Sequence, residues 1–69
     1  MAHFSSIRPT RHYIEKHERN VPWHKVVEII LKTKNPRRKG NKFEIEKDKY
    51  YVLFEIKNNV LCVINAKKS

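Results

Sequence analysis

The C-terminal part of the chain contains two runs of β-branched and aromatic residues, 49–57 and 60–67, that predict a β-hairpin. The dipeptide Asn58-Asn59 separates the runs. Asparagine tolerates the positive φ angles of a two-residue hairpin turn, and such a turn fixes the register of the strands. The expected pairs are Lys57 with Val60, Ile56 with Leu61, Phe54 with Val63, and Val52 with Asn65.

This register divides the side chains of the hairpin between two faces. The first face is uniformly apolar, so we expect it to be covered; it comprises Val52, Phe54, Ile56, Leu61 and Val63. The second face is mixed and comprises Tyr51, Leu53, Glu55, Lys57, Val60, Cys62, Ile64 and Ala66. Because the second strand is apolar on both faces, we expect it to lie inside the sheet rather than at an edge.

A third strand is expected at residues 42–47, where apolar and charged residues alternate strictly. Asp48-Lys49 can close a second tight turn, so the same apolar face extends over three antiparallel strands. The expected pairs are Phe43 with Phe54 and Ile45 with Val52. The opposite side of this strand carries Lys42, Glu44 and Glu46.

Two helices are expected upstream of these strands. Pro9 and Thr10 are typical of a helix start, and we expect a first helix over residues 9–19 with a narrow apolar stripe. That stripe is formed by Tyr13, Ile14 and His17. A second helix is expected from Pro22 in its first turn. Its residues at the spacing of one helical face are Trp23, Val26, Val27, Ile30 and Leu31.

These elements predict a single α+β domain over residues 1–69. A short N-terminal strand can form within residues 1–6, and the two helices follow it. The second helix is the natural partner for the apolar face of the three-stranded antiparallel sheet, and Trp23 is expected to anchor one end of that contact. Sixty-nine residues leave no room for a second domain.

The chain is strongly basic, with 16 Lys and Arg against seven Asp and Glu and a net charge of +9. Nucleic acid phosphate is the first partner that this charge indicates, an acidic protein the second and an anionic membrane surface the third, although the charge can also serve solubility alone. The sequence shows neither a membrane span nor the apolar core of a signal peptide. We therefore expect a cytoplasmic protein without a membrane partner.

A basic segment, residues 34–42, joins the second helix to the sheet. Pro36 and Gly40 interrupt regular structure there, so we expect a loop. Cations of this segment and one in the last strand are the candidates for contacts with nucleic acid: Arg37, Arg38, Lys39, Lys42 and Lys67. A solvated connection without a ligand is the alternative interpretation.

The chain offers no spacing typical of a metal or cofactor site. His12 and His17 are five residues apart, so on a helix we expect them to point in different directions, and the single cysteine, Cys62, is expected to be a small core residue. Basic and imidazole side chains remain. They suit RNA cleavage by attack of the 2′-hydroxyl on the adjacent phosphate, which needs a base, an acid and cationic groups but no metal ion.

A resemblance to a known family is carried by two segments, RHYIEKHERNVPWHKVVEII (residues 11–30) and KYYVLFEIKNNVLCVINAKK (residues 49–68). With the order strand, helix, helix and three strands, they resemble the RelE/ParE-like toxins of toxin-antitoxin modules, and more closely a group of small toxin-like domains. The resemblance covers residues 4–67. In this resemblance, His12 matches the histidine near the start of the group's pattern. Arg19 matches the arginine that ends its basic helix, and Val21 matches the apolar residue of the short segment that follows.

The resemblance implies ribosome-dependent cleavage of mRNA, although other members of the superfamily poison gyrase or have lost activity. The RNA-cleaving members use basic residues and a C-terminal Tyr or His close to the sheet. The last strand of this chain departs from that pattern, because it offers Asn65, Lys67 and Lys68 instead.

Three functions are therefore open. The first is a toxin-like endoribonuclease without metal or cofactor, with Arg11, His12 and Arg19 as its catalytic residues. The second is a non-catalytic module that binds RNA or the ribosome through the basic segment. The third is a module whose charge serves an acidic, antitoxin-like protein partner.

Overall fold

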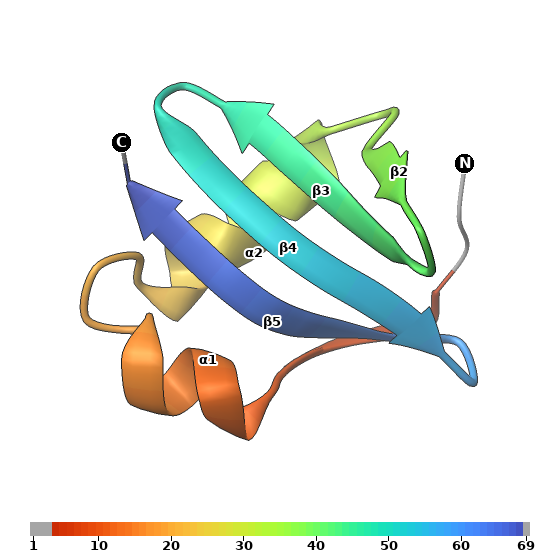
Figure 1. Ribbon diagram of the computed structural model, residues 1–69, viewed down its shortest axis with the longest axis horizontal. Helices are drawn as coiled ribbons and strands as arrows, with labels where there is room; N and C mark the ends of the chain where they lie inside the picture. Colours follow the sequence, from red (N-terminus) through yellow and green to blue (C-terminus); the bar gives the residue numbers. More distant parts are fainter. Residues whose placement is uncertain (1–3, 69) are drawn as a thin grey trace.

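The computed structural model describes residues 4–68 and has the expected α+β class (Figure 1). Its elements are β1 (Ser6–Pro9), α1 (Arg11–Lys16), α2 (Trp23–Lys32), β2 (Arg37–Lys39), β3 (Lys42–Lys47), β4 (Tyr50–Lys57) and β5 (Val60–Lys68). An N-terminal strand was expected within residues 1–6, but β1 shares only Ser6 with that segment and continues to Pro9. His3 lies outside the described residues.

The sheet is larger than the expected three strands, because β1 and β2 extend it to five in the order β1-β5-β4-β3-β2. The short β1 pairs with β5 in parallel, and the other neighbours are antiparallel. The position of β5 inside the sheet, expected from its two apolar faces, is confirmed. Figure 1 shows α2 behind the sheet and α1 beside β5, and within residues 4–68 no helix covers the face toward the viewer.

Both tight turns form as expected. Asn58 and Asn59 have φ angles of 51° and 66°, and Asp48 and Lys49 have 52° and 71°. Positive φ at both central residues gives a turn whose twist matches that of the flanking strands. The pairs that follow are confirmed: Lys57 with Val60, Ile56 with Leu61, Phe54 with Val63, Phe43 with Phe54, and Ile45 with Val52.

One expected pair is wrong, because Val52 lies opposite Ala66 instead of Asn65. Leu53 takes Asn65 as its partner, and the shift leaves Ile64 as an extra residue in β5, a β-bulge. Ala66 therefore belongs to the apolar face, where it is completely buried, and not to the mixed face. The bulge turns Asn65 to the other face of the sheet, where its Oδ1 atom is still buried without a hydrogen-bond partner.

The apolar face of α2 also differs from the expected one. Val26, Ile29 and Ile30 are buried, whereas Leu31 is 66% exposed. A helix rotates by about 100° per residue, so a stripe centred on Val26 and Ile30 also includes Ile29 and turns Leu31 outward. The expected apolar face included Leu31, which lies outside the buried stripe, and omitted Ile29, which lies inside it.

The first helix is shorter than expected, because Pro9 ends β1 and the helix stops at Lys16. Thr10 caps it: the hydroxyl oxygen accepts from the Tyr13 backbone N–H and the hydroxyl donates to the Val63 carbonyl oxygen of β5 at 2.7 Å. Tyr13 is completely buried and its ring centroid is 5.6 Å from that of Trp23, so Trp23 packs against one end of the core as expected. Ile14, which was expected in the stripe, is 48% exposed.

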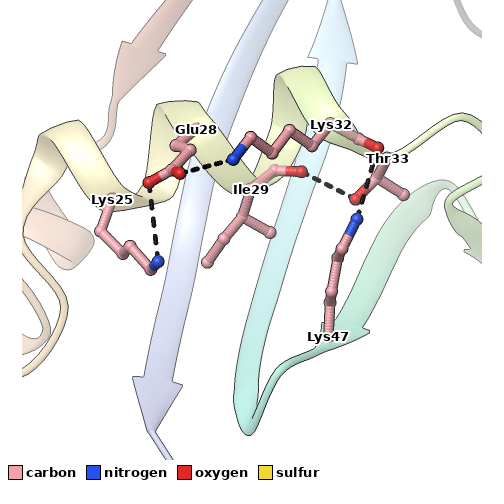
Figure 2. Close-up of polar contacts among 6 residues, drawn as sticks. All are labelled: Lys25, Glu28, Ile29, Lys32, Thr33 and Lys47. Carbon is pink, nitrogen blue, oxygen red and sulfur yellow. Dashed lines mark hydrogen bonds and ion pairs between the residues drawn. The ribbon is translucent and has the colours of Figure 1, made fainter.

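The C-terminal end of α2 is held by polar contacts (Figure 2). Thr33 donates its hydroxyl hydrogen to the Ile29 carbonyl oxygen at 2.7 Å, and Lys47 of β3 donates to the Lys32 carbonyl oxygen at 3.5 Å. Glu28 pairs with Lys32 at 2.8 Å on the outer side of the helix. The bonds from Thr33 and Lys47 satisfy carbonyl groups that the last helical turn leaves unpaired, and the bond from Lys47 ties α2 to the sheet.

Neither helix in residues 4–68 has the length and apolar content needed to cross a bilayer.

Candidate functional site

A row of ionisable side chains crosses the uncovered face of the sheet from β2 to β5; we call it the open-face row (Arg37, Glu44, Tyr51 and Lys67). Arg37 Nε lies 2.7 Å from Glu44 Oε1, and the Tyr51 hydroxyl donates to Glu44 Oε2 at 2.8 Å. Lys67 Nζ lies 5.3 Å from the centroid of the Tyr51 ring. The register places Arg37 opposite Glu44 and Tyr51 opposite Lys67, so the sheet itself positions these groups.

The hydrogen bonds of the row set its protonation states. The bond from Tyr51 and the bond from Arg37 lower the pKa of Glu44. Burial, followed by the bond to Glu44, raises the pKa of Tyr51. At neutral pH Glu44 is therefore ionised and Tyr51 keeps its proton. The phenol is held as a donor to the carboxylate, and Glu44 in turn orients Arg37.

The row borders a depression of about 470 Å³ in the same face of the sheet. Four cations, two carboxylates and two tyrosines line it: Arg37, Lys39, Lys67, Lys68, Glu44, Glu46, Tyr50 and Tyr51. Cations beside aromatic rings are the combination that holds single-stranded nucleic acid, because phosphates need positive charge and bases stack on rings.

His12, in the first turn of α1, and His17, at the end of α1, form a pair whose Nε2 atoms are 3.1 Å apart. The expectation that these residues point in different directions is wrong. Residues five apart on a regular helix differ by about 140° in direction, but His17 is the residue at which α1 ends, with φ −125°. The departure from helical geometry at that residue returns its ring to the side of His12, so the ring centroids are 4.9 Å apart.

The histidine pair is coupled electrostatically to one member of the open-face row, Lys67. Burial, then the proximity of His12 and then that of Lys67, lower the pKa of His17. Lys67 is thus close enough to act on His17 electrostatically while it also lies over the Tyr51 ring. The lowered pKa keeps His17 in its neutral form at pH 7, so a nitrogen lone pair is available there.

The structure separates the predicted catalytic residues from one another. His12 is in the pair, while Arg11 is directed away to Glu15, at 3.4 Å, and its side chain is 90% exposed. Arg19 lies exposed in the turn that follows α1. The roles predicted for Arg11 and Arg19 stay predictions.

The basic segment is not only a loop, because residues 37–39 form the edge strand β2. Strand alternation divides its cations between the two sides of the sheet. Arg37 and Lys39 line the depression together with Lys67, whereas Arg38 lies opposite Phe43, 5.9 Å from its ring centroid. Pro36 and Gly40 flank β2 and mark its ends, which explains why a three-residue strand between them resembled a loop.

Sequence reasoning missed several members of this site: His17, Glu44, Tyr50, Tyr51 and Lys68. The alternation of β3 had placed Glu44 on the mixed side, but its ion pair with Arg37 required knowledge of β2. Lys42 lies on the same strand, half-buried, with its Nζ 3.4 Å from Asn41 Oδ1.

Comparisons with protein-family models, curated proteins and solved structures found no match to this chain. The chain is a small α+β domain with two helices and a five-stranded mixed sheet in residues 4–68.

Proposed function

We propose that this chain is an endoribonuclease that cleaves RNA with its own side chains. The observation that supports this function best is the contact between His12 and His17, with Lys67 near enough to lower the pKa of His17 while it also lines the depression. An imidazole pair supplies a proton acceptor at neutral pH, and Lys67 supplies positive charge and a proton.

The proposed reaction begins when a neutral imidazole of the pair accepts the proton of a ribose 2′-hydroxyl. The 2′-oxygen then forms a bond to the adjacent phosphorus, and the extra negative charge of the phosphorane is stabilised by the Lys67 ammonium. The bond from phosphorus to the 5′-oxygen breaks, and Lys67 donates a proton to that oxygen. The products are a 2′,3′-cyclic phosphate and a 5′-hydroxyl, and water exchange restores both groups.

His17 is the better candidate for the base, because its lowered pKa keeps it neutral. His12 hydrogen-bonds to it and can stabilise the imidazolium that forms. Arg37 and Lys39 hold the strand in the depression, and Tyr51 offers a ring for base stacking. Arg11 and Arg19 are proposed to contact flanking phosphates.

The order of strand, helix, helix and sheet strands is compatible with the resemblance to RelE/ParE-like toxins, and we include that relationship in the proposal. It supplies the substrate class, mRNA, with or without the ribosome, and places the activity in the cytoplasm. The net charge of +9 is also complementary to an acidic, antitoxin-like protein partner, which would inhibit cleavage by covering the site.

Binding without cleavage is the second candidate function. It is favoured by the ion pair between Arg37 and Glu44, because a carboxylate fixed among the cations orients them without itself acting on RNA. In this case the depression binds single-stranded RNA and the histidine pair plays no chemical part.

The test is incubation of the purified protein with end-labelled RNA, in EDTA, with and without ribosomes. His12→Ala, His17→Ala and Lys67→Ala should each reduce cleavage at least about tenfold. His24→Ala is the matched control, since His24 is exposed on α2 and outside the pair. Lys67→Arg keeps the positive charge but removes the proton donor, so it should bind RNA normally and cleave slowly. Full cleavage by both histidine variants would contradict the proposal, and binding without cleavage would favour the second candidate.

A further inference from the structure

We propose that His12 and His17 together bind one divalent transition metal ion of the zinc class, and that the bound ion blocks the chemistry of the pair. The binding rests on geometry alone. Only the consequence, inhibition of RNA cleavage, rests on the proposed function.

The distance between the two imidazoles suits a shared metal ion. Zinc binds histidine nitrogen at about 2.0 to 2.1 Å, so two nitrogens on one ion are about 3.3 Å apart in tetrahedral geometry and about 2.9 Å apart at a right angle. The Nε2 atoms of His12 and His17 are 3.1 Å apart, between these two values. Both rings must also turn away from the direct line between their Nε2 atoms, so that the two lone pairs converge on the ion.

The backbone that carries the pair is fixed before any ion binds. Tyr13, next to His12, is completely buried, and the Thr10 cap holds the start of α1 on β5. The His17 backbone N–H donates to the Tyr13 carbonyl oxygen at 2.8 Å. Metal binding therefore orders little of the chain, and the rings themselves remain accessible at the surface.

The chemistry of the ligands selects the kind of ion. Neutral imidazole nitrogen suits Zn²⁺, Ni²⁺ and Cu²⁺, whereas Mg²⁺ and Ca²⁺ prefer oxygen. Metal binding needs the lone pairs of both Nε2 atoms, and the proton now shared between them must move to Nδ1 or be released.

The site should be weak and exchangeable. Within residues 4–68 no group of three or more His, Cys, Asp and Glu side chains could hold a metal ion, so water completes the coordination. The Lys67 ammonium near His17 also opposes a second cation. An ion held in this way responds to its free concentration, and it occupies the same nitrogen atoms that the proposed cleavage uses.

Isothermal titration with Zn²⁺, in the absence of RNA, tests the binding. The background variant is His3→Ala, which removes an imidazole two residues from the N-terminus in the sequence. One ion per chain should bind, His12→Ala and His17→Ala should each weaken binding at least about tenfold, and His24→Ala should leave it unchanged. Mg²⁺ should not bind at this site. Binding that is absent, or that is the same in all variants, would overturn the proposal.

The inhibition is tested separately on the same proteins. Zn²⁺ should stop RNA cleavage over the concentration range in which it binds, and EDTA should restore it. If the chain does not cleave RNA, the titration result still stands, so failure of the proposed function is distinguishable from failure of the metal site. Cleavage that continues at saturating Zn²⁺ would overturn the inhibitory role.

Discussion

Tyr13 donates its hydroxyl hydrogen to the backbone carbonyl oxygen of Val21, and both residues are completely buried. This bond joins α1 to the segment that leads into α2. Burial, and then the charge of Glu18, raise the pKa of Tyr13, so the phenol stays protonated at physiological pH. Tyr13→Phe leaves the Val21 carbonyl group buried without a partner and should cost about 1 to 3 kcal/mol of unfolding free energy. Urea denaturation checks this, with the exposed neighbour change Ile14→Ala as a control expected within about 0.5 kcal/mol.

Phe54 is the largest side chain of the sheet in the core, 2% exposed and stacked on Phe43 with ring centroids 5.5 Å apart. Phe54→Ala leaves a cavity beneath α2 that the surrounding strands cannot close. We expect a loss of about 3 to 5 kcal/mol, measured by denaturant unfolding. A loss below about 1 kcal/mol would contradict the burial of Phe54 in the core and place its side chain on the uncovered face of the sheet.

The two faces of α2 can be told apart by a pair of substitutions of similar size. Ile29 is buried and Leu31 is 66% exposed. Ile29→Ala should cost about 2 to 5 kcal/mol, whereas Leu31→Ala should change stability by no more than about 0.5 kcal/mol. Thermal melting of both variants is sufficient. If Leu31→Ala destabilised the protein more than Ile29→Ala, the buried face of α2 would be the one that includes Leu31.

Glu44 should give the protein a stability that depends on acid pH. Its folded-state pKa is lowered by Tyr51 first and then by Arg37, with Lys39 Nζ at 3.9 Å as a further cation. A lowered folded-state pKa contributes stability that is fully present above the unfolded value, near 4.5, and is lost as the pH falls through the folded value. Glu44→Gln removes this contribution. The difference in unfolding free energy between wild type and Glu44→Gln should therefore shrink below pH 4.5. A difference that is constant from pH 7 to pH 3 would contradict the assignment.

The salt dependence of RNA binding should separate the two sides of β2. Lys39 lines the depression and Arg38 lies on the opposite side. Each phosphate contact to a single strand contributes about 0.7 to the slope of log K against log salt concentration. Lys39→Ala and Lys67→Ala should each lower the slope by about that amount, and Arg38→Ala should not. Fluorescence anisotropy with a labelled oligonucleotide measures the slopes. Equal effects of Lys39→Ala and Arg38→Ala would mean that the strand follows the edge of β2 rather than the depression.

Local signals were sufficient for the strand pairing next to the two tight turns. The Asn58-Asn59 turn sets the pairing of β4 with β5 close to the turn, and the Asp48-Lys49 turn does the same for β3 with β4. A two-residue turn leaves only one register. Thr10 likewise marked the start of α1. In each case the structure depends on residues within a few positions of one another.

The candidate site depended on contacts that no local pattern contains. The bulge at Ile64 brought Tyr51 opposite Lys67 and turned Ala66 into the core, where it is completely buried. The end of α1 at His17 brought the two imidazoles together, because the backbone departs from helical geometry at that residue.

The sequence by itself thus determined the class of the fold, the hairpins and the basic character of the protein, because periodicity, turn residues and charge are local properties. Only the tertiary structure decided which cations share a face and which histidines meet. These relationships follow from long-range packing, in which one buried side chain shifts a register or ends a helix for residues far from it in the chain.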